Sequence, residues 1–136
     1  MSLNDINEVL HSIGRRDSIP NLAISSNGCA GITLADGVSL YFQWNEEHRM
    51  LTLYSCLFDS PPRGTSSQAL YQTLLRLNCL TPGPVLSMHP ERDDIYLQLI
   101  FLPGAFNVEG LDRAINQLTS RRKTLLRHLQ EKGLQL

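Results

Sequence analysis

The chain has 136 residues and a mass of 15.3 kDa, so we expect a single domain over residues 1–136. Its 42% hydrophobic and 18% charged residues exclude a chain that is too polar to pack a core. Twelve basic and thirteen acidic residues nearly cancel, which excludes a strong overall attraction to nucleic acid or to an anionic membrane.

The cysteines and the N-terminal sequence favour a cytosolic protein. Cys29, Cys56 and Cys79 are odd in number and far apart, so we expect no disulfide framework and a reducing compartment. The first residues lack the basic leader and long apolar core of a signal peptide. No apolar run approaches the roughly 20 residues of a membrane span, so we expect no insertion into membranes.

The first predicted element is a short amphipathic helix over residues 3–13. Ile6, Leu10 and Ile13 recur there at helical spacing, which predicts one apolar side. Gly14 follows the last of them and is the predicted end of the helix.

Three strands are predicted next, over residues 29–35, 38–44 and 50–58. The dipeptides Asn27-Gly28 and Asp36-Gly37 are typical of turns, because both residue types tolerate a positive φ. Period-two alternation gives the second and third strands one apolar face each. These faces consist of Val38, Leu40, Phe42 and Trp44, and of Leu51, Leu53 and Leu57. The other face of the third strand is also largely apolar, so we expect neither of its faces to be simply solvated.

A second helix is predicted over residues 65–80, with Thr65 as its N-cap and Gln68 completing a capping box. Two more strands follow over residues 84–90 and 95–102, joined by a charged turn.

A last helix is predicted to begin after the N-cap Asn107 and to end before Gly133. The order is therefore helix, three strands, helix, two strands, helix. This order predicts an α+β fold in which three helices pack against a twisted, antiparallel, five-stranded sheet.

The second helix has more apolar surface than one core requires. Leu70, Leu74 and Leu77 form a stripe, and Tyr71, Leu75 and Leu80 widen it to roughly 220° against the 100° or so of a helix on one core. The helix must therefore be covered from two directions. One interpretation is a homodimer in which it meets its symmetry mate, and the other is a central helix buried within a monomer.

The stretch "ALYQTLLRLNCLTPGPVLSMHPERDDIYLQLIFLPG", residues 69–104, resembles the signature region of class I type III secretion chaperones, the Tir-chaperone family. The shared features are a leucine-rich helix ending in "LLRLN", a strand after a loop, a charged turn, and a strand with alternating leucines. The stretch "NGCAGITLADGVSLYFQW", residues 27–44, is similar to the first hairpin of the family. The size and the order of elements agree over nearly the whole chain.

The resemblance implies a bacterial, cytosolic homodimer that performs no reaction and uses no cofactor or metal. Its partner would be the N-terminal, non-globular segment of a type III secreted effector, which wraps around the dimer in extended form and is kept soluble. Delivery to the secretion ATPase is also implied. The middle helix would contribute the dimer interface, with Leu70, Tyr71, Leu74, Leu75, Leu77 and Asn78.

An effector segment of this kind can add a strand to a sheet edge and place side chains in apolar grooves. The first helix and the early strands are the predicted source of these grooves. The candidate effector-binding residues are Ile6, Val9, Leu10, Ile13, Ile32, Leu34, Phe42 and Trp44. For each of them the alternative is an ordinary place in the core.

The charge of the chain departs from the family, many of whose members are clearly acidic. The pI is near 6.4, and residues 107–136 hold six Lys or Arg against three Asp or Glu. An acidic binding surface is therefore not carried over from the family to this chain.

Three other functions were weighed. An enzyme is disfavoured because the histidines are scattered and no nucleophile, metal or phosphate-binding motif is present. Nucleic-acid binding is disfavoured because its one basic run, residues 121–128, also suits a helix C-terminus without any ligand. The nearest rival is a regulatory, anti-activator-like module of the same fold that binds a secretion regulator.

Overall fold

A computed structural model describes residues 1–59, 66–80, 83–102 and 104–133. Within these residues it contains three helices and five strands in the predicted order. The elements are α1 (Leu3–Arg16), β1 (Cys29–Thr33), β2 (Ser39–Asn45), β3 (Met50–Phe58), α2 (Ser67–Leu80), β4 (Val85–Met88), β5 (Ile95–Phe101) and α3 (Val108–Glu131). The predicted α+β fold, with one antiparallel five-stranded sheet, is confirmed.

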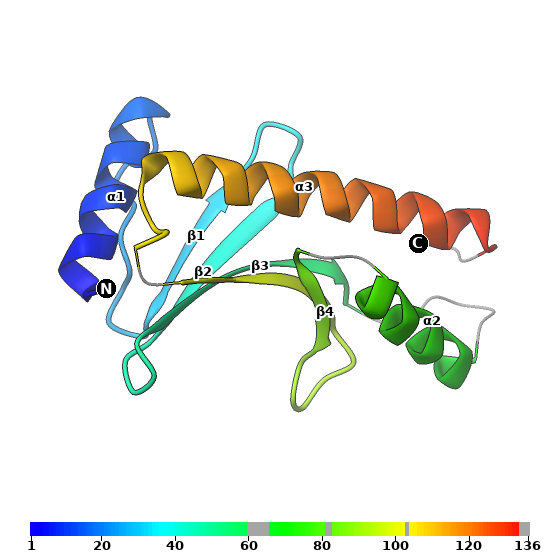
Figure 1. Cartoon of the computed structure of the whole chain (residues 1–136). Coiled ribbons are helices and arrows are strands. Elements are labelled where there is room, and N and C mark those ends of the chain that lie inside the picture. The colour runs from blue at the N-terminus through cyan, green and yellow to red at the C-terminus, as the bar shows by residue number, and fades with distance from the viewer. Residues whose placement is uncertain (60–65, 81–82, 103, 134–136) are drawn as a thin grey trace.

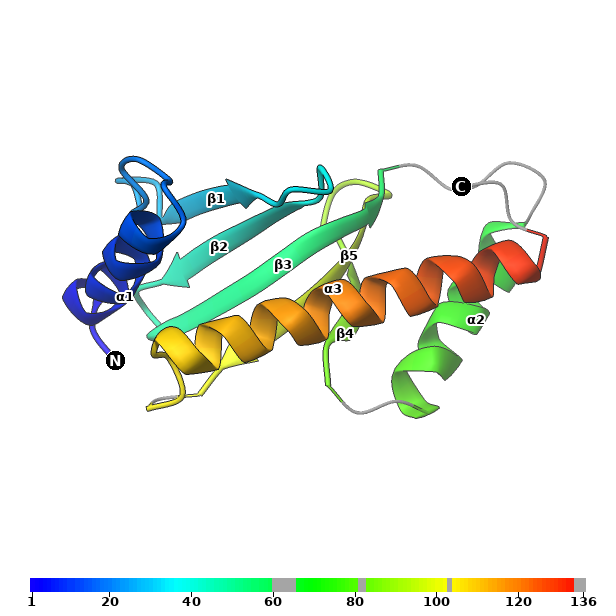
Figure 2. The same cartoon turned by 90° about the horizontal axis from the view of Figure 1, so that it is seen from above.

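The strands lie in the order β1-β2-β3-β5-β4, so β1 and β4 form the two edges of the sheet. Helices α1 and α3 cover one face, and α3 runs across it and extends beyond the sheet (Figures 1 and 2). Helix α2 lies at the β4 end instead of on that face (Figure 1). The opposite face carries no helix, and the β2–β3 and β4–β5 turns both bend away from α3 on that side (Figure 1).

The core lies between this sheet and the helices α1 and α3. Alternate residues of each strand face it, as period-two patterning predicts. In β2, for example, Leu40 and Phe42 are fully buried, whereas Tyr41 between them is 41% exposed. Helix α3 adds apolar residues at spacings of three, four and seven: Leu111, Ala114, Leu118, Leu125 and Leu129.

The predicted end of the first helix at Gly14 is wrong. The helix continues to Arg16, and Gly14 is buried inside it. A Cβ atom at Gly14 would lie 2.8 Å from the carbonyl oxygen of Ile19, so the absent side chain lets the following loop pack against the helix. Tertiary packing accounts for this glycine, and no helix stop is needed.

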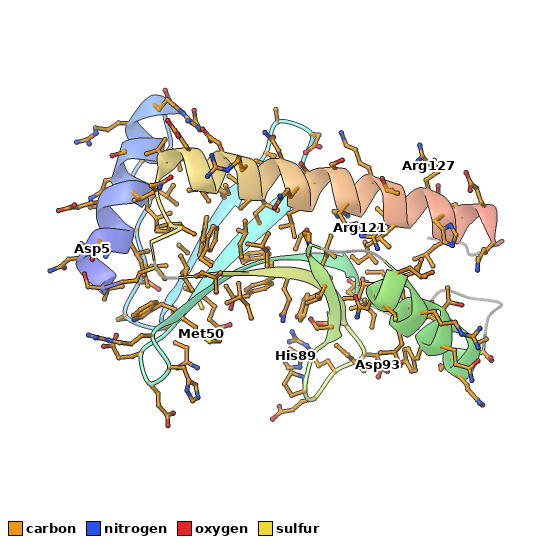
Figure 3. All side chains as sticks on the ribbon, viewed as in Figure 1. Asp5, Met50, His89, Asp93, Arg121 and Arg127 are labelled. Carbon is orange, nitrogen blue, oxygen red and sulfur yellow. The ribbon has the colours of Figure 1, made fainter. Side chains whose placement is uncertain are left out.

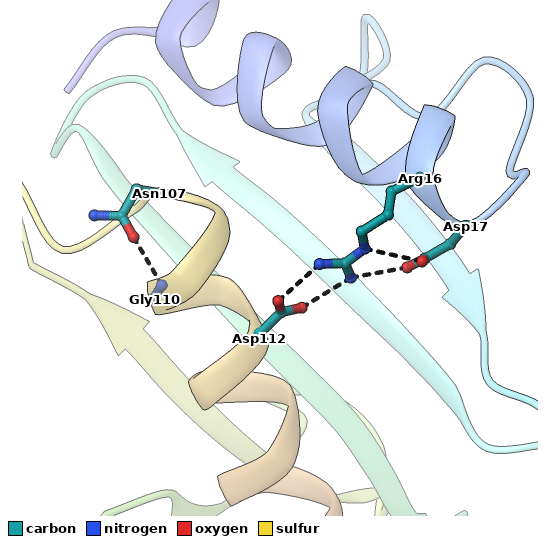
Figure 4. A network of polar contacts seen from close by, with 5 residues as sticks. All are labelled: Arg16, Asp17, Asn107, Gly110 and Asp112. Atoms are coloured by element: carbon teal, nitrogen blue, oxygen red, sulfur yellow. Dashed lines mark hydrogen bonds and ion pairs between the residues drawn. The ribbon is translucent and has the colours of Figure 1, made fainter.

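The caps of the other two helices agree with the sequence in part. Asn107 is the N-cap of α3, and its side-chain oxygen accepts a 2.7 Å hydrogen bond from the backbone N–H of Gly110 (Figure 4). For α2, the predicted cap Thr65 lies outside the described residues. The hydroxyl of Ser66 accepts a 3.1 Å hydrogen bond from the backbone N–H of Ala69 and serves as a cap there.

A charged network joins α1 to α3. Both terminal nitrogens of the Arg16 guanidinium donate to the Asp112 carboxylate, at 2.7 and 2.9 Å, and Arg16 also pairs with Asp17 (Figure 4). Such bidentate pairs fix the relative orientation of two elements. The hydrogen bonds from Arg16 hold the pKa of the Asp112 carboxyl below its ordinary value.

We expect Asp112→Asn to lower the stability modestly at neutral pH and not at all in strong acid. Because the folded pKa of Asp112 is lowered, its contribution is complete above the unfolded value of about 3.9 and is lost as the pH falls through the folded value. Both side chains are nearly half-exposed, so water and salt keep the effect small. Urea unfolding of both proteins at neutral pH and near pH 2 checks this. An equal loss at both pH values would mean that packing, not charge, is responsible.

Candidate functional site

Helix α2 packs one side on its own sheet and leaves another side uncovered. Leu70 and Leu74 are only 2% and 5% exposed and belong to the core, whereas Leu75 is 69% exposed. Strand β4, beside the helix, also presents apolar side chains to solvent. The exposed apolar residues of the two elements, named here the α2–β4 surface, are Leu75, Leu80, Val85 and Met88.

A cavity of about 230 Å³ opens on this surface between α2 and β4. Its lining includes four of the predicted interface residues: Tyr71, Leu74, Leu75 and Asn78. The other two, Leu70 and Leu77, are buried and half-buried against the core of the same chain. The excess apolar surface of α2 is therefore real, and a dimer across it stays a prediction.

Asn78 has a second role, which is to close the β4 edge of the sheet. Its side-chain NH₂ donates to the carbonyl of Leu86 at 2.9 Å, and its side-chain oxygen accepts from the N–H of Leu86 at 2.7 Å. The Asn78 amide therefore satisfies the N–H and C=O of Leu86, which point away from β5. A partner strand therefore cannot pair at the middle of β4 without displacing Asn78.

We expect Asn78→Ala to lower the free energy of unfolding by about 2 kcal/mol, because the N–H and C=O of Leu86 lose their partners in a half-buried place. Urea unfolding followed by circular dichroism measures the loss. Gln72→Ala is the matched control, since Gln72 is an exposed residue of the same helix. If both variants unfold at the same urea concentration, Asn78 does not tie α2 to β4.

The β1 edge, in contrast, is open. The Trp44 N–H donates to the Gly28 carbonyl at 2.8 Å, which fixes the alternation of hydrogen bonds between β1 and β2. By this alternation Gly31 and Thr33 direct their backbone N–H and C=O groups away from β2. No backbone hydrogen bond from the described residues reaches these groups. They can accept an added strand.

An apolar cavity of about 540 Å³ lies beside this open edge, on the helix-covered side of the sheet. Ile13 of α1, Ile32 and Leu34 near the edge, and Ile115 of α3 line it. The Arg16–Asp112 network lies at the same cavity. A strand added to β1 would place every second side chain there.

Aromatic side chains form a row on the helix-free face of the sheet. The rings of Tyr41 and Tyr54 stack at 5.5 Å, and Tyr96 meets Tyr54 edge-on at 5.4 Å. Gly31 continues this row to the β1 edge, because the Tyr41 ring lies 3.3 Å from the position that a Gly31 Cβ would take. Burial raises the pKa of Tyr54, so its hydroxyl stays protonated at neutral pH.

Tyr54 and Tyr96 border a cavity of about 650 Å³ between the two turns, where Met50 and His89 also lie (Figure 3). None of them is among the predicted binding residues. Each strand contributes a single ring, so only the strand register brings Tyr41, Tyr54 and Tyr96 together. The sequence signal that could have found them is a tyrosine, in each of the strands β2, β3 and β5, at a position that alternates with the core residues.

The predicted effector-binding residues separate into two groups. Ile6, Leu10, Phe42 and Trp44 are at most 8% exposed and pack in the core, and their contact with a partner stays a prediction. They follow the apolar pattern because they fill the sheet–helix interface. The second group has four residues. Ile13 and Ile32 are buried but line the cavity beside β1, and Leu34 lines the same cavity and is half-exposed. Val9 is half-buried in α1.

The basic run on α3 is distributed around the helix instead of forming one face. Arg121 points toward α2, where its guanidinium lies 3.5 Å from the carbonyl oxygen of Leu77, while Arg127 points away from the sheet (Figure 3). Burial lowers the pKa of Arg121. Arg122 is half-buried. This arrangement gives nucleic acid no continuous basic stripe.

Among the residues that the structure describes, no three His, Cys, Asp or Glu side chains come together as metal ligands would. No helix in the same residues combines the length and apolarity needed to cross a membrane. Cys29, Cys56 and Cys79 are all free thiols.

No protein-family model and no curated protein matches the sequence. Solved structures do match. A chain of the ExsC–ExsE complex aligns with a TM-score of 0.75 and 15% identity, over 92% of this chain and 93% of that one. A chain of the HopA1–SchA chaperone–effector complex aligns with a TM-score of 0.70 and 16% identity, over 91% and 96%.

A third structure is that of the Yersinia pestis type III secretion chaperone SycH in complex with a stable fragment of YscM2. It aligns with a TM-score of 0.64 and 15% identity, over 88% of this chain and 98% of that one. Almost the whole of each chain takes part in these alignments, so the likeness concerns the complete fold. This chain therefore has the fold of the type III secretion chaperones, as the resemblance of its sequence predicted.

Proposed function

We propose that this protein is a cytosolic bacterial chaperone that binds the N-terminal, non-globular segment of a type III secreted effector and keeps it soluble for secretion. The observation that carries the proposal is the open β1 edge, which has an apolar cavity on one side and the aromatic row on the other. The shared fold supports it, because the neighbouring structures include a chaperone–effector complex.

The proposed binding begins with backbone pairing. An extended segment hydrogen-bonds to Gly31 and Thr33, and alternate side chains enter the cavity beside Ile13 and Leu34. The intervening side chains lie over the ring of Tyr41. Ordering a disordered segment costs about 2–5 kcal/mol, and each well-buried apolar anchor returns about 1.5–3 kcal/mol, so the segment needs several such anchors to bind.

The proposed chaperone is a homodimer joined through the α2–β4 surface. A second copy related by a two-fold axis would cover Leu75, Leu80, Val85 and Met88 with the same four side chains of its own. The two β1 edges would then serve one client, which could wrap around the dimer and pass with it to the secretion ATPase. No reaction is part of this function.

Co-expression with the product of the adjacent gene tests the proposal. We expect that product to be insoluble alone, soluble with the chaperone, and co-eluted with it at a mass that corresponds to two chaperone chains and one chain of the product. Truncation of its N-terminal segment should abolish the complex. A product that is soluble alone and does not co-elute contradicts the proposal. If the bound protein is retained in the cell and acts on transcription, the regulatory alternative is correct.

A further inference from the structure

Strand β5 is longer than the strand that pairs with its outer side. All of β5 pairs with β3, up to Phe101 opposite Leu51. On the other side, β4 reaches only as far as Val85 opposite Gln98. Among the described residues, Leu99 to Phe101 at the end of β5 therefore have a strand neighbour on one side only, although β5 is an inner strand of the sheet.

The backbone of Ile100 faces this open side. The N–H and C=O of Leu86 point to Asn78, away from β5, so Leu86 forms no ladder hydrogen bonds with its partner Leu97. Because such pairs alternate along an antiparallel ladder, Gln98 and Tyr96 are the residues of β5 that hydrogen-bond to β4. The same alternation along β5 directs the N–H and C=O of Ile100 toward the β4 side. No backbone hydrogen bond from the described residues reaches them.

The ladder ends here for a local reason. Gly83 would stand opposite Ile100 if β4 began two residues earlier. Its φ of +104° is not that of an extended strand, and Pro84 beside it has no N–H to donate. The ladder of β4 with β5 therefore begins only at Val85.

The open end of β5 also has an apolar cavity and a free cation. A cavity of about 250 Å³ lies between it and α3, lined by Leu99, Ala114 and Arg113 among others. Ile100 is 45% exposed and Leu102 is 71% exposed. Arg113 is exposed and forms no ion pair with a carboxylate of the described residues, and no acidic side chain lines the cavity.

We propose that this end of β5 is a second peptide-docking site, which takes a short extended segment carrying an apolar residue and, two residues on, a carboxylate. The segment pairs with the N–H and C=O of Ile100 as a local extension of β4. Residues two apart share one side of a strand, so the apolar side chain enters the cavity while the carboxylate reaches Arg113. This goes beyond the proposed chaperone function, because neither the β1 edge nor the α2–β4 surface takes part.

The probe is a synthetic peptide, acetyl-Thr-Val-Leu-Thr-Asp-Thr-amide, added to the full chain labelled with nitrogen-15. We expect millimolar binding that shifts the amide resonance of Ile100 and the side-chain resonance of Arg113. The twin peptide with Lys in place of Asp should bind about threefold more weakly, and Arg113→Glu should reverse this preference. Arg113 is exposed on α3, so that variant is expected to fold.

Ile100→Pro removes the outward N–H without touching the hydrogen bonds to β3, and should weaken binding about fivefold. The proposal is overturned if the peptide shifts only Gly31 and Thr33, if it shifts nothing up to its solubility limit, or if the Lys twin binds equally well. It is also overturned if light scattering gives the Ile100→Pro variant a smaller assembly mass than the wild type. The occupant of the site would then be a second copy of the chain.

Discussion

Leu75→Glu is expected to convert the proposed dimer into a folded monomer. Leu75 is 69% exposed in the single chain, so a glutamate there does not disturb the core. At a two-fold interface the change occurs twice, and each copy loses an apolar contact of about 1.5–3 kcal/mol and gains a charge that must be desolvated. The dimer should weaken by at least about a hundredfold. Light scattering and sedimentation at micromolar concentration measure the mass.

Two companion variants make this result specific. Gln130→Glu adds the same charge at an exposed position of α3 and should leave the dimer intact. Leu74→Glu, one residue from Leu75, should unfold the protein instead, because Leu74 is only 5% exposed. A wild-type protein with a mass of 15.3 kDa in solution, or a Leu75→Glu variant that is still dimeric, would exclude the α2–β4 surface as the interface.

The second large effect is expected at the β1 edge, where Thr33→Pro should reduce client binding by at least about tenfold. The substitution removes an outward N–H and places a ring where the added strand must approach. The β1–β2 ladder keeps its hydrogen bonds, because Thr33 does not direct its backbone groups toward β2. Isothermal titration with the N-terminal segment of the co-purified client gives the affinity, and thermal unfolding confirms the fold.

Thr33→Val is the matched control for this prediction. It keeps the backbone N–H and changes only an exposed side chain, so it should bind the client like the wild type. If Thr33→Val and Thr33→Pro lose the same affinity, the side chain is responsible and strand addition is wrong. If neither loses affinity, the client does not pair with β1, although it can still bind elsewhere on the protein.

The sequence predicted the elements well where a regular pattern continued over many residues. Leu40 and Phe42 alternate with polar neighbours, and the sheet places that pattern on the core side, because a strand has no other way to bury its apolar residues. Gly14 shows where local rules fail. It is typical of a helix end, yet its missing side chain admits the Ile19 carbonyl, a contact that no local pattern encodes.

Binding residues were harder to predict than elements. Ile6 and Phe42 have the apolar character that a client-binding groove requires, and the core requires the same character. Only the packing separates them from Leu34 and Leu75, which keep exposed surface. The excess of apolar side chains on α2 was visible in the sequence, but which of them face outward depends on how the helix sits against β4.

The sequence by itself determined the order of the elements, the buried face of each strand, and the surplus apolar surface of the second helix. These follow from periodicity, because residues 2.0 or 3.6 positions apart share a side whatever surrounds them. Only the tertiary structure decided which sheet edges are open. Asn78 closes β4, whereas Gly31 and Ile100 stay accessible, because backbone hydrogen-bond partners come from strand order and register, which join residues far apart along the chain.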